Sequence, residues 1–292
     1  MSNAIQYLGM NIERLCDENI VPDLSQRVLK SAKNRVLPSF FIAGVEKCGT
    51  SSLFHYLLQH RSIIPPQRKD TYFFSNNNRY NKGIEFYRAF FAHKYYKKLA
   101  ELRRGNKTIT LDSTAIYFDY PQVPQRIHSM FPNTKVILML REPVSRTYSN
   151  YNMAVKFGFE TLPFEKAIEM EEERVKWFEN SVYNKGHNFA FQRVIYKSRS
   201  EYINYLPNWK NVFGDNLYIE FAENLSAKPQ ETFNGVLDFL GLKHQTVNFE
   251  KLNEGSYKSK MDEGTKQKLT EHFRPLNEKL ASYLGRELPW KQ

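Results

Sequence analysis

Residues 44–51 read GVEKCGTS, and this stretch decides the fold. An apolar run from Val36 to Val45 leads into it, and a helix-like run from Ser52 to His60 follows it. The order predicts a strand, a glycine-bearing loop and the start of a helix. Such a loop holds a phosphate group, because successive backbone N–H groups and the positive end of the helix dipole converge on one anion.

The glycine spacing of this loop is that of a Walker P-loop, but its lysine is displaced. Thr50 follows the second glycine of the G-x-x-x-x-G pattern, where a nucleotide-hydrolysing enzyme or a kinase carries lysine. Lys47 lies inside the loop instead. The displacement indicates a phosphate chemistry other than ATP hydrolysis.

A second cationic motif follows another apolar run, Lys135 to Leu140, which is typical of a parallel strand buried on both faces. Arg141 comes directly after the run, where a P-loop nucleotidase has an aspartate for Mg²⁺. A guanidinium matches two phosphate oxygens, and Ser149 follows about two helical turns later. We expect Arg141 and Ser149 to meet at one anion, without a metal; a surface arginine paired with Glu142 is the alternative.

Strands that alternate with helices along the chain predict an α/β fold. We expect a P-loop-like three-layer fold, in which helices flank a central, mainly parallel sheet and ligands lie at the carboxyl ends of its strands. Residues 1–34 are predicted to form an N-terminal helical extension, and residues 35–292 a single domain. The expected strands are 36–45, 108–111, 135–140 and 216–220. The expected helices are 50–60, 83–103, 124–130, 143–156, 163–178, 189–206, 228–240 and 265–284.

The composition narrows the classes of function. A net charge of +11 favours anionic ligands such as nucleotides or sulfated compounds. Cys16 and Cys48 are the only cysteines, so a disulfide framework is excluded, and the seven histidines show no metal-ligand spacing. No apolar run reaches the roughly 18–20 residues of a membrane span, and residues 1–30 lack a signal-peptide core. We expect a cytoplasmic protein.

The two motifs together resemble those of the sulfotransferases that use 3′-phosphoadenosine 5′-phosphosulfate (PAPS). Residues 47–53, KCGTSSL, resemble the family's K-x-G-T-[ST]-[ST]-L loop, which binds the 5′-phosphosulfate. Arg141, with the Glu-Pro that follows it and Ser149, resembles the R-[DE]-P motif and the serine that bind the 3′-phosphate. The resemblance implies PAPS as cosubstrate, 3′,5′-ADP as product and no metal. It implies cofactor binding by Lys47, Cys48, Gly49, Thr50, Ser51, Ser52, Arg141 and Ser149.

Further segments resemble the heparan-sulfate branch of O- and N-sulfotransferases. Residues 69–74, KDTYFF, look like its K-E-x-x-F-F, which makes Asp70 the general base. Residues 112–118, DSTAIYF, fall where that branch has E-K-[ST]-x-x-Y-F, so Ser113 replaces a lysine. In the 69–74 segment, Asp70 is one methylene shorter than the branch's glutamate. The acceptor is therefore not carried over. The acceptor-binding residues expected from this resemblance are Lys69, Ser113, Thr114 and His187.

A late basic loop, residues 255–260 with the sequence GSYKSK, resembles the family's loop that closes over the nucleotide. The resemblance assigns Lys258 and Lys260 to the 3′-phosphate and Tyr257 to stacking on adenine. His187, next to a glycine, is an alternative general base.

The implied reaction is in-line displacement on sulfur. A hydroxyl or amine of a sugar or small natural product loses its proton to Asp70, and Lys47 stabilises charge on the leaving oxygen. One alternative is a kinase with an aberrant P-loop, which the missing strand-end aspartate disfavours. Another is a noncatalytic basic protein that binds polyanions or nucleic acid with a steep salt dependence, although no nucleic-acid-binding motif is present.

Overall fold

The computed structural model describes residues 9–10, 24–179, 191–250 and 260–290. The chain forms two compact units, which are described separately. The first, here called the sheet unit, comprises residues 23–141 and 205–253. The second, the helical unit, comprises residues 1–22, 142–204 and 254–292.

The sheet unit is built on four parallel strands in the order β2-β1-β3-β4. Their bounds are Phe40–Gly44 for β1, Leu111–Ser113 for β2, Lys135–Leu140 for β3 and Leu217–Phe221 for β4. All of β1 and all of β3 after its first residue are buried, as their uninterrupted apolar sequences predict. The predicted mainly parallel sheet is confirmed, although β1 is shorter than expected and β2 lies slightly later in the chain.

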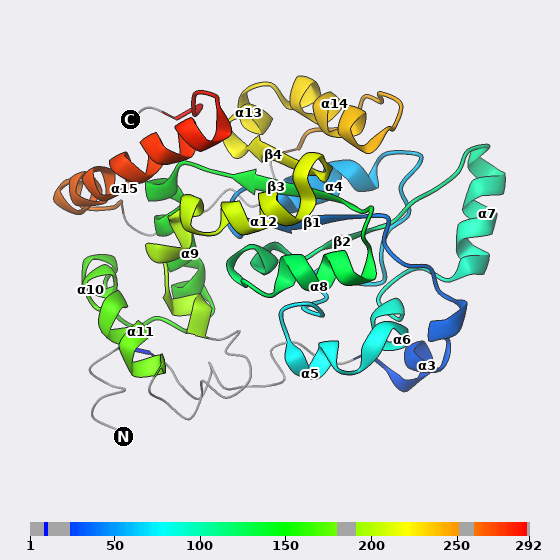
Figure 1. Ribbon diagram of the computed structural model, residues 1–292, viewed down its shortest axis with the longest axis horizontal. Helices are drawn as coiled ribbons and strands as arrows, with labels where there is room; N and C mark the ends of the chain where they lie inside the picture. Colours follow the sequence, from blue (N-terminus) through cyan, green and yellow to red (C-terminus); the bar gives the residue numbers. More distant parts are fainter. Residues whose placement is uncertain (1–8, 11–23, 180–190, 251–259, 291–292) are drawn as a thin grey trace. The chain divides into compact units, whose positions relative to one another are not determined.

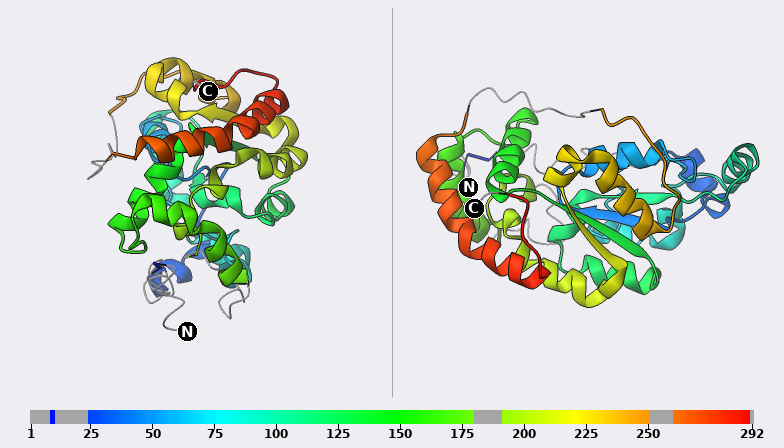
Figure 2. Two further views of the ribbon diagram at one scale, coloured as in Figure 1. Left: turned by 90° about the vertical axis from the view of Figure 1, so that its left-hand side faces the viewer. Right: turned by 90° about the horizontal axis from the view of Figure 1, so that it is seen from above.

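Helices cover both faces of this sheet, which confirms the three-layer prediction (Figures 1 and 2). The helices α4, α13 and α14 lie on one face, and α8 and α12 lie on the other. Their bounds are Thr50–Leu58, Ala222–Ala227, Pro229–Leu240, Val123–Met130 and Leu206–Phe213, in that order. Gly241 ends α14 in the left-handed conformation, at φ 73°, as a C-terminal glycine allows.

Four further helices lie beside the sheet. They are α3 (Gln26–Lys30), α5 (Asn77–Tyr80), α6 (Gly83–Arg88) and α7 (Lys94–Arg104). The single helix expected over 83–103 is therefore divided into α6 and α7. The division follows from the buried segment between them, and from His93, whose ring nitrogen accepts the Tyr95 N–H at 3.2 Å and starts α7.

The helical unit packs its helices around aromatic clusters. Its helices are α9 (Pro143–Lys156), α10 (Phe164–Glu169), α11 (Glu171–Glu179) and α15 (Glu263–Leu284). Val144 and Tyr148 on α9 pack with Phe164 on α10 and with Leu269 and Phe273 on α15.

None of the helices in the described ranges is both long enough and apolar enough to span a bilayer.

The helix predicted over 189–206 is wrong for the residues described there. From residue 191 the chain forms three short 3₁₀ turns, Phe191–Val194, Ser198–Ser200 and Tyr202–Asn204, before α12 begins. The buried carboxylate of Glu171 accepts the backbone N–H groups of Tyr196, Lys197 and Ser198 at 2.7, 2.7 and 2.8 Å. Because these groups are taken by a side chain from another helix, they are not available for the ladder of an α-helix.

Candidate active site

The candidate site lies at the carboxyl ends of the parallel strands. Strand order reverses between β1 and β3, since β2 continues from β1 in one direction and β4 from β3 in the other. In open α/β sheets, ligands bind in the crevice at such a switch point. Lys47 follows β1 and Arg141 follows β3, so the two predicted phosphate-binding cations flank it. Ser113 ends the neighbouring strand β2, and Thr114 follows it.

The loop after β1 has the backbone expected of an anion-binding loop. Lys47 and Gly49 both adopt the left-handed conformation, with φ of 69° and 83°, and Gly49 immediately precedes α4. The N–H groups of the first turn of α4, which begins at Thr50, have no acceptor within the helix. These N–H groups, together with the positive end of the helix dipole, attract a phosphate. Cys48 is fully buried, and its thiol lies 3.8 Å from the carbonyl oxygen of Glu46; its predicted contact with the cofactor stays a prediction.

Arg141 lies beside this loop. One of its guanidinium nitrogens donates to the backbone carbonyl of Lys47 at 3.4 Å. Glu142 caps α9, because its carboxylate accepts the N–H groups of Val144 and Ser145 at 2.8 and 2.6 Å. Ser149 is buried on α9, in the helical unit, so the anion site shared by Arg141 and Ser149 stays a prediction.

Lys69 and Asp70 reach the same loop from the following segment. The Lys69 ammonium donates to the Ser51 hydroxyl at 3.1 Å and lies 3.4 Å from the Asp70 carboxylate. Asp70 has a φ of 59°, which is uncommon outside glycine, and its side chain keeps 31% of its exposure. Strained backbone of this kind concentrates at functional sites. The structure therefore brings together the predicted base, a neighbouring cation and the phosphate loop.

The surroundings of Asp70 suit a proton acceptor. Burial raises the pKa of its carboxyl above the ordinary value, Lys69 opposes this rise and the Glu46 carboxylate adds to it. A carboxylate with a raised pKa is a stronger base, and catalysis by a positioned base is most effective when its pKa approaches the working pH.

The sequence analysis assigned no role to Asp112, which anchors this segment. The fully buried carboxylate of Asp112 accepts the hydroxyls of Thr71, Tyr87 and Tyr117 on one oxygen, at 2.9, 2.8 and 3.1 Å, and that of Thr114 on the other at 2.6 Å. Thr114 also accepts the N–H of Thr71 at 2.9 Å. Since Thr71 follows Asp70, the network fixes the chain next to the predicted base. Thr114 is part of this network, and its predicted contact with the acceptor stays a prediction.

Asp112 also gives a testable pH dependence of stability. Burial raises its pKa from 3.8 to about 6, although the hydroxyl donors oppose the rise. The resulting contribution to folding is fully present below the unfolded-state pKa and is lost as the pH rises through about 6. Asp112→Asn should remove it, so the wild type should lose about 2.5 kcal/mol relative to the variant between about pH 4 and pH 7.

Urea unfolding of both proteins across this pH range measures the difference directly. Other carboxyls titrate equally in the two proteins and cancel. Parallel stability curves would contradict the raised pKa of Asp112.

Several predicted residues lie outside the described ranges, and others are described without a contact to the predicted phosphate loop. Tyr257, Lys258 and His187 fall on residues that the structure does not describe, and their roles stay predictions. Lys260 is exposed, three residues before α15 begins. Ser113 is buried, and its backbone carbonyl accepts the Asp70 N–H at 3.0 Å.

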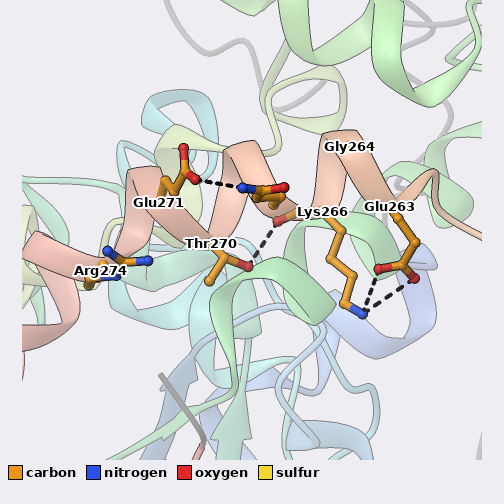
Figure 3. Close-up of a pocket in the computed structure, with 7 residues that line it drawn as sticks. Glu263, Gly264, Lys266, Thr270, Glu271 and Arg274 are labelled. Atoms are coloured by element: carbon orange, nitrogen blue, oxygen red, sulfur yellow. Dashed lines mark hydrogen bonds and ion pairs between the residues drawn. The ribbon is translucent and has the colours of Figure 1, made fainter.

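A hollow of about 340 Å³ along α15 is a weaker candidate (Figure 3). Its cations, Lys266 and Arg274, alternate with the acids Glu263 and Glu271. Lys266 pairs with Glu263 at 3.2 Å, so the hollow has no excess of positive charge to hold a phosphate. Within the ranges given above, no group of three or more His, Cys, Asp or Glu residues is arranged to hold a metal ion.

Comparison with protein families gives one match that covers most of the chain. The model of the "Sulfotransferase domain" matches residues 37–283. The matched range includes residues of both compact units.

Individual proteins agree with this match. Human heparan sulfate glucosamine 3-O-sulfotransferase 5 is 26% identical over 280 residues, which cover 87% of this chain and 74% of the relative. The membrane-associated sulfotransferase kil1 of Dictyostelium discoideum is 24% identical and covers 87% of this chain and 67% of its own length. The crystal structure of a sulfotransferase from Alicyclobacillus acidocaldarius superimposes with a TM-score of 0.66 at 26% identity, covering 87% of this chain and 98% of that one.

Proposed function

The chain belongs to the sulfotransferase family, and we propose that it transfers the sulfonate group of PAPS to a hydroxyl or amine of a sugar or small natural-product acceptor. One observation carries the proposal. At the switch point of the sheet, the lysine lies within the loop at Lys47 and Arg141 directly follows β3. A nucleotide-hydrolysing enzyme has a lysine at the start of the helix and a magnesium-binding aspartate after the strand instead.

In the proposed reaction, PAPS supplies a sulfonate bonded to a phosphate leaving group. The acceptor oxygen or nitrogen bonds to sulfur as the bond from sulfur to the bridging oxygen breaks, and the acceptor proton passes to Asp70. Lys47 and the N–H groups at the start of α4 stabilise the charge that develops on the departing phosphate. Arg141, with Ser149, holds the 3′-phosphate of the nucleotide.

The surroundings of Asp70 support its role as the base. Lys69 lies between the Asp70 carboxylate and the Ser51 hydroxyl, and so links the base to the loop that would hold the sulfonate donor. The backbone N–H of Asp70 bonds to β2 and the next residue bonds to the Asp112 network. A base fixed at both ends loses little freedom when the acceptor arrives, which is the condition for efficient proton transfer.

The proposal also includes the domain organisation of the chain and its location in the cell. We propose that residues 35–292 form one sulfotransferase domain, preceded by an extension of residues 1–34; the family match over 37–283 supports this. A cytoplasmic location stays a prediction, to be tested by cell fractionation.

The donor site is tested by calorimetric titration with 3′,5′-ADP and with Mg-ATP. Wild type should bind 3′,5′-ADP and bind Mg-ATP far less. Arg141→Ala should bind 3′,5′-ADP about 10–100-fold more weakly, because a charge-assisted hydrogen bond to the 3′-phosphate is lost. The matched control is Arg103→Ala, which changes an exposed arginine of α7 and should leave the affinity unchanged.

Two results would contradict the donor site. If wild type does not bind 3′,5′-ADP, the sulfotransferase activity is wrong for this chain. If Mg-ATP binds instead, the kinase alternative gains support.

The acceptor is identified by a screen with PAPS. The human relative is named for a heparan sulfate glucosamine acceptor, so glucosamine-containing oligosaccharides belong in the screen. Because Ser113 stands where the resembled motif has a lysine, hydroxyl and amine compounds without anionic groups are screened beside them.

A further inference from the structure

Helix α7 lies at the edge of the sheet unit, away from the sheet (Figures 1 and 2). One side of the helix holds it in place. Ala100 is buried, the Arg104 guanidinium donates to the carbonyl of Ile63 at 2.9 Å, and the Glu101 carboxylate accepts the N–H of Thr108 at 2.8 Å. The opposite side of α7 therefore faces solvent.

Large apolar side chains occupy the solvent side of α7. Leu102 is 80% exposed and Tyr95 is 71% exposed, the two highest values among the exposed large hydrophobic residues of the described chain. They are seven residues apart, so they lie on one face two turns from each other, and Leu99, which is half-buried, lies between them on that face. Single exposed apolar residues are common, but an aligned stripe of them marks an interaction surface.

Cations border this stripe on both sides. At 100° per residue, Lys94 and Lys98 lie on one side of it and Arg103 lies on the other, and all three are exposed. Glu101 is the only carboxylate in the α7 sequence, and it lies on the anchored side, 3.8 Å from Lys97. The outward residues of α7 thus combine an apolar centre with a margin of positive charge.

Neighbouring elements extend the positive margin. The Lys94 ammonium donates to the carbonyl of Lys33 at 3.0 Å, which places the exposed Lys33 beside the start of α7. Lys107 is exposed just beyond the C-terminal glycine of the helix. The outer face of α15 differs, because acids alternate with its cations (Figure 3).

We propose that α7 docks the protein onto a bilayer surface that contains acidic phospholipids. The helix lies in the plane of the headgroups, with Tyr95, Leu99 and Leu102 inserted at the acyl boundary and the bordering cations among the lipid phosphates. A sulfated polysaccharide would attract the same cations but would leave the apolar stripe in water, whereas a bilayer accepts both. The docking is a surface contact and does not depend on the transfer reaction.

Vesicle flotation tests the proposal, with vesicles of phosphatidylcholine alone and of phosphatidylcholine mixed with phosphatidylserine. Wild type should float with the mixed vesicles and not with the neutral ones. Lys98→Glu/Arg103→Glu should reduce the partition coefficient at least about 25-fold, because each cation near an acidic surface contributes about fivefold. Tyr95→Ser/Leu102→Ser should reduce it about tenfold or more, because the inserted apolar area is lost.

Matched changes on α15 serve as controls. Lys268→Glu/Lys279→Glu makes the same change in net charge, and Tyr283→Ser removes an aromatic side chain of 42% exposure. Both should bind the mixed vesicles as wild type does. Circular dichroism and thermal unfolding establish that every variant is folded before its flotation is compared.

Three outcomes would overturn the proposal. Wild type that remains unbound with mixed vesicles has no such surface. Equal losses in the α7 and α15 charge variants would mean attraction by net charge alone. The third outcome has two parts: Tyr95→Ser/Leu102→Ser binds vesicles as wild type does, and the α7 charge variant binds neither vesicles nor dextran sulfate. The surface would then bind polyanions and not a bilayer.

Discussion

Asp70→Asn should lower kcat by about 10²–10⁴-fold, the usual contribution of a positioned general base. The amide has the same shape as the carboxyl but does not take the proton of the acceptor. Affinity for 3′,5′-ADP should stay close to that of wild type, because Asp70 is assigned to the acceptor and not to the nucleotide. Steady-state sulfonate transfer from PAPS and calorimetry on the same preparation measure the two quantities.

Asp70→Glu is the matched control, since it keeps the carboxylate and restores the length found in the resembled motif. It should retain far more activity than the asparagine variant. In wild type, kcat/KM should rise as the pH passes through the pKa of Asp70 and level off above it. Burial raises this pKa, so the fall at acid pH should begin above the range of an ordinary aspartate.

An asparagine variant with wild-type kcat would move the base elsewhere. His187, the alternative base, would then be tested by His187→Gln. A loss of 3′,5′-ADP affinity together with kcat would instead mean that Asp70 supports the loop and does not act on the acceptor.

Lys47→Ala should lower kcat by about 10²–10³-fold. In the proposed reaction, the lysine stabilises negative charge on the oxygen that leaves sulfur, and this charge is present only as the bond breaks. The affinity for 3′,5′-ADP should fall by about tenfold or less, because the backbone N–H groups of the loop and Arg141 still hold the two phosphates. Single-turnover transfer from PAPS separates the chemical step from product release.

Lys69→Ala is the comparison for Lys47→Ala, because it removes a cation that contacts the same loop from the following segment. Lys69 contacts Ser51 and Asp70 and should affect the pH profile more than the maximal rate. If Lys47→Ala and Lys69→Ala reduce kcat equally and leave the pH profile unchanged, the two lysines act only through the summed positive charge of the site.

The central part of the fold was predictable because its signals are local. Residues 135–140 form an uninterrupted apolar run, and β3 has the bounds that this run predicts. The glycine loop at 44–51 likewise lies between a strand and a helix, as its neighbours indicate. The helix expected over 189–206 failed for a tertiary reason. Glu171 binds three consecutive N–H groups of that segment, and its carboxylate lies 25 or more residues away in the sequence.

The residues of the candidate site also divide into those that the local sequence indicates and those whose role depends on distant parts of the chain. Spacing alone indicates Lys47 and Arg141, since Arg141 directly follows β3 and Lys47 lies in the glycine loop three residues after β1. The role of Asp112 depends on hydroxyls supplied by Thr71 and Tyr87, which precede it by 41 and 25 residues. A local signal existed, because Asp112 is the only charged residue in the run from 108 to 118, but only the folded chain identifies its donors.

The order of the strands has a consequence for how the protein is made. Both partners of β1 come later in the chain, β2 about seventy residues after it and β3 about ninety. At 5–20 residues per second, the ribosome needs roughly 5–20 s to supply both. Until then, the apolar segment FFIAG has unpaired edges in the nascent chain. Chaperone supply and slow translation at low temperature should therefore decide how much of the newly made protein escapes aggregation.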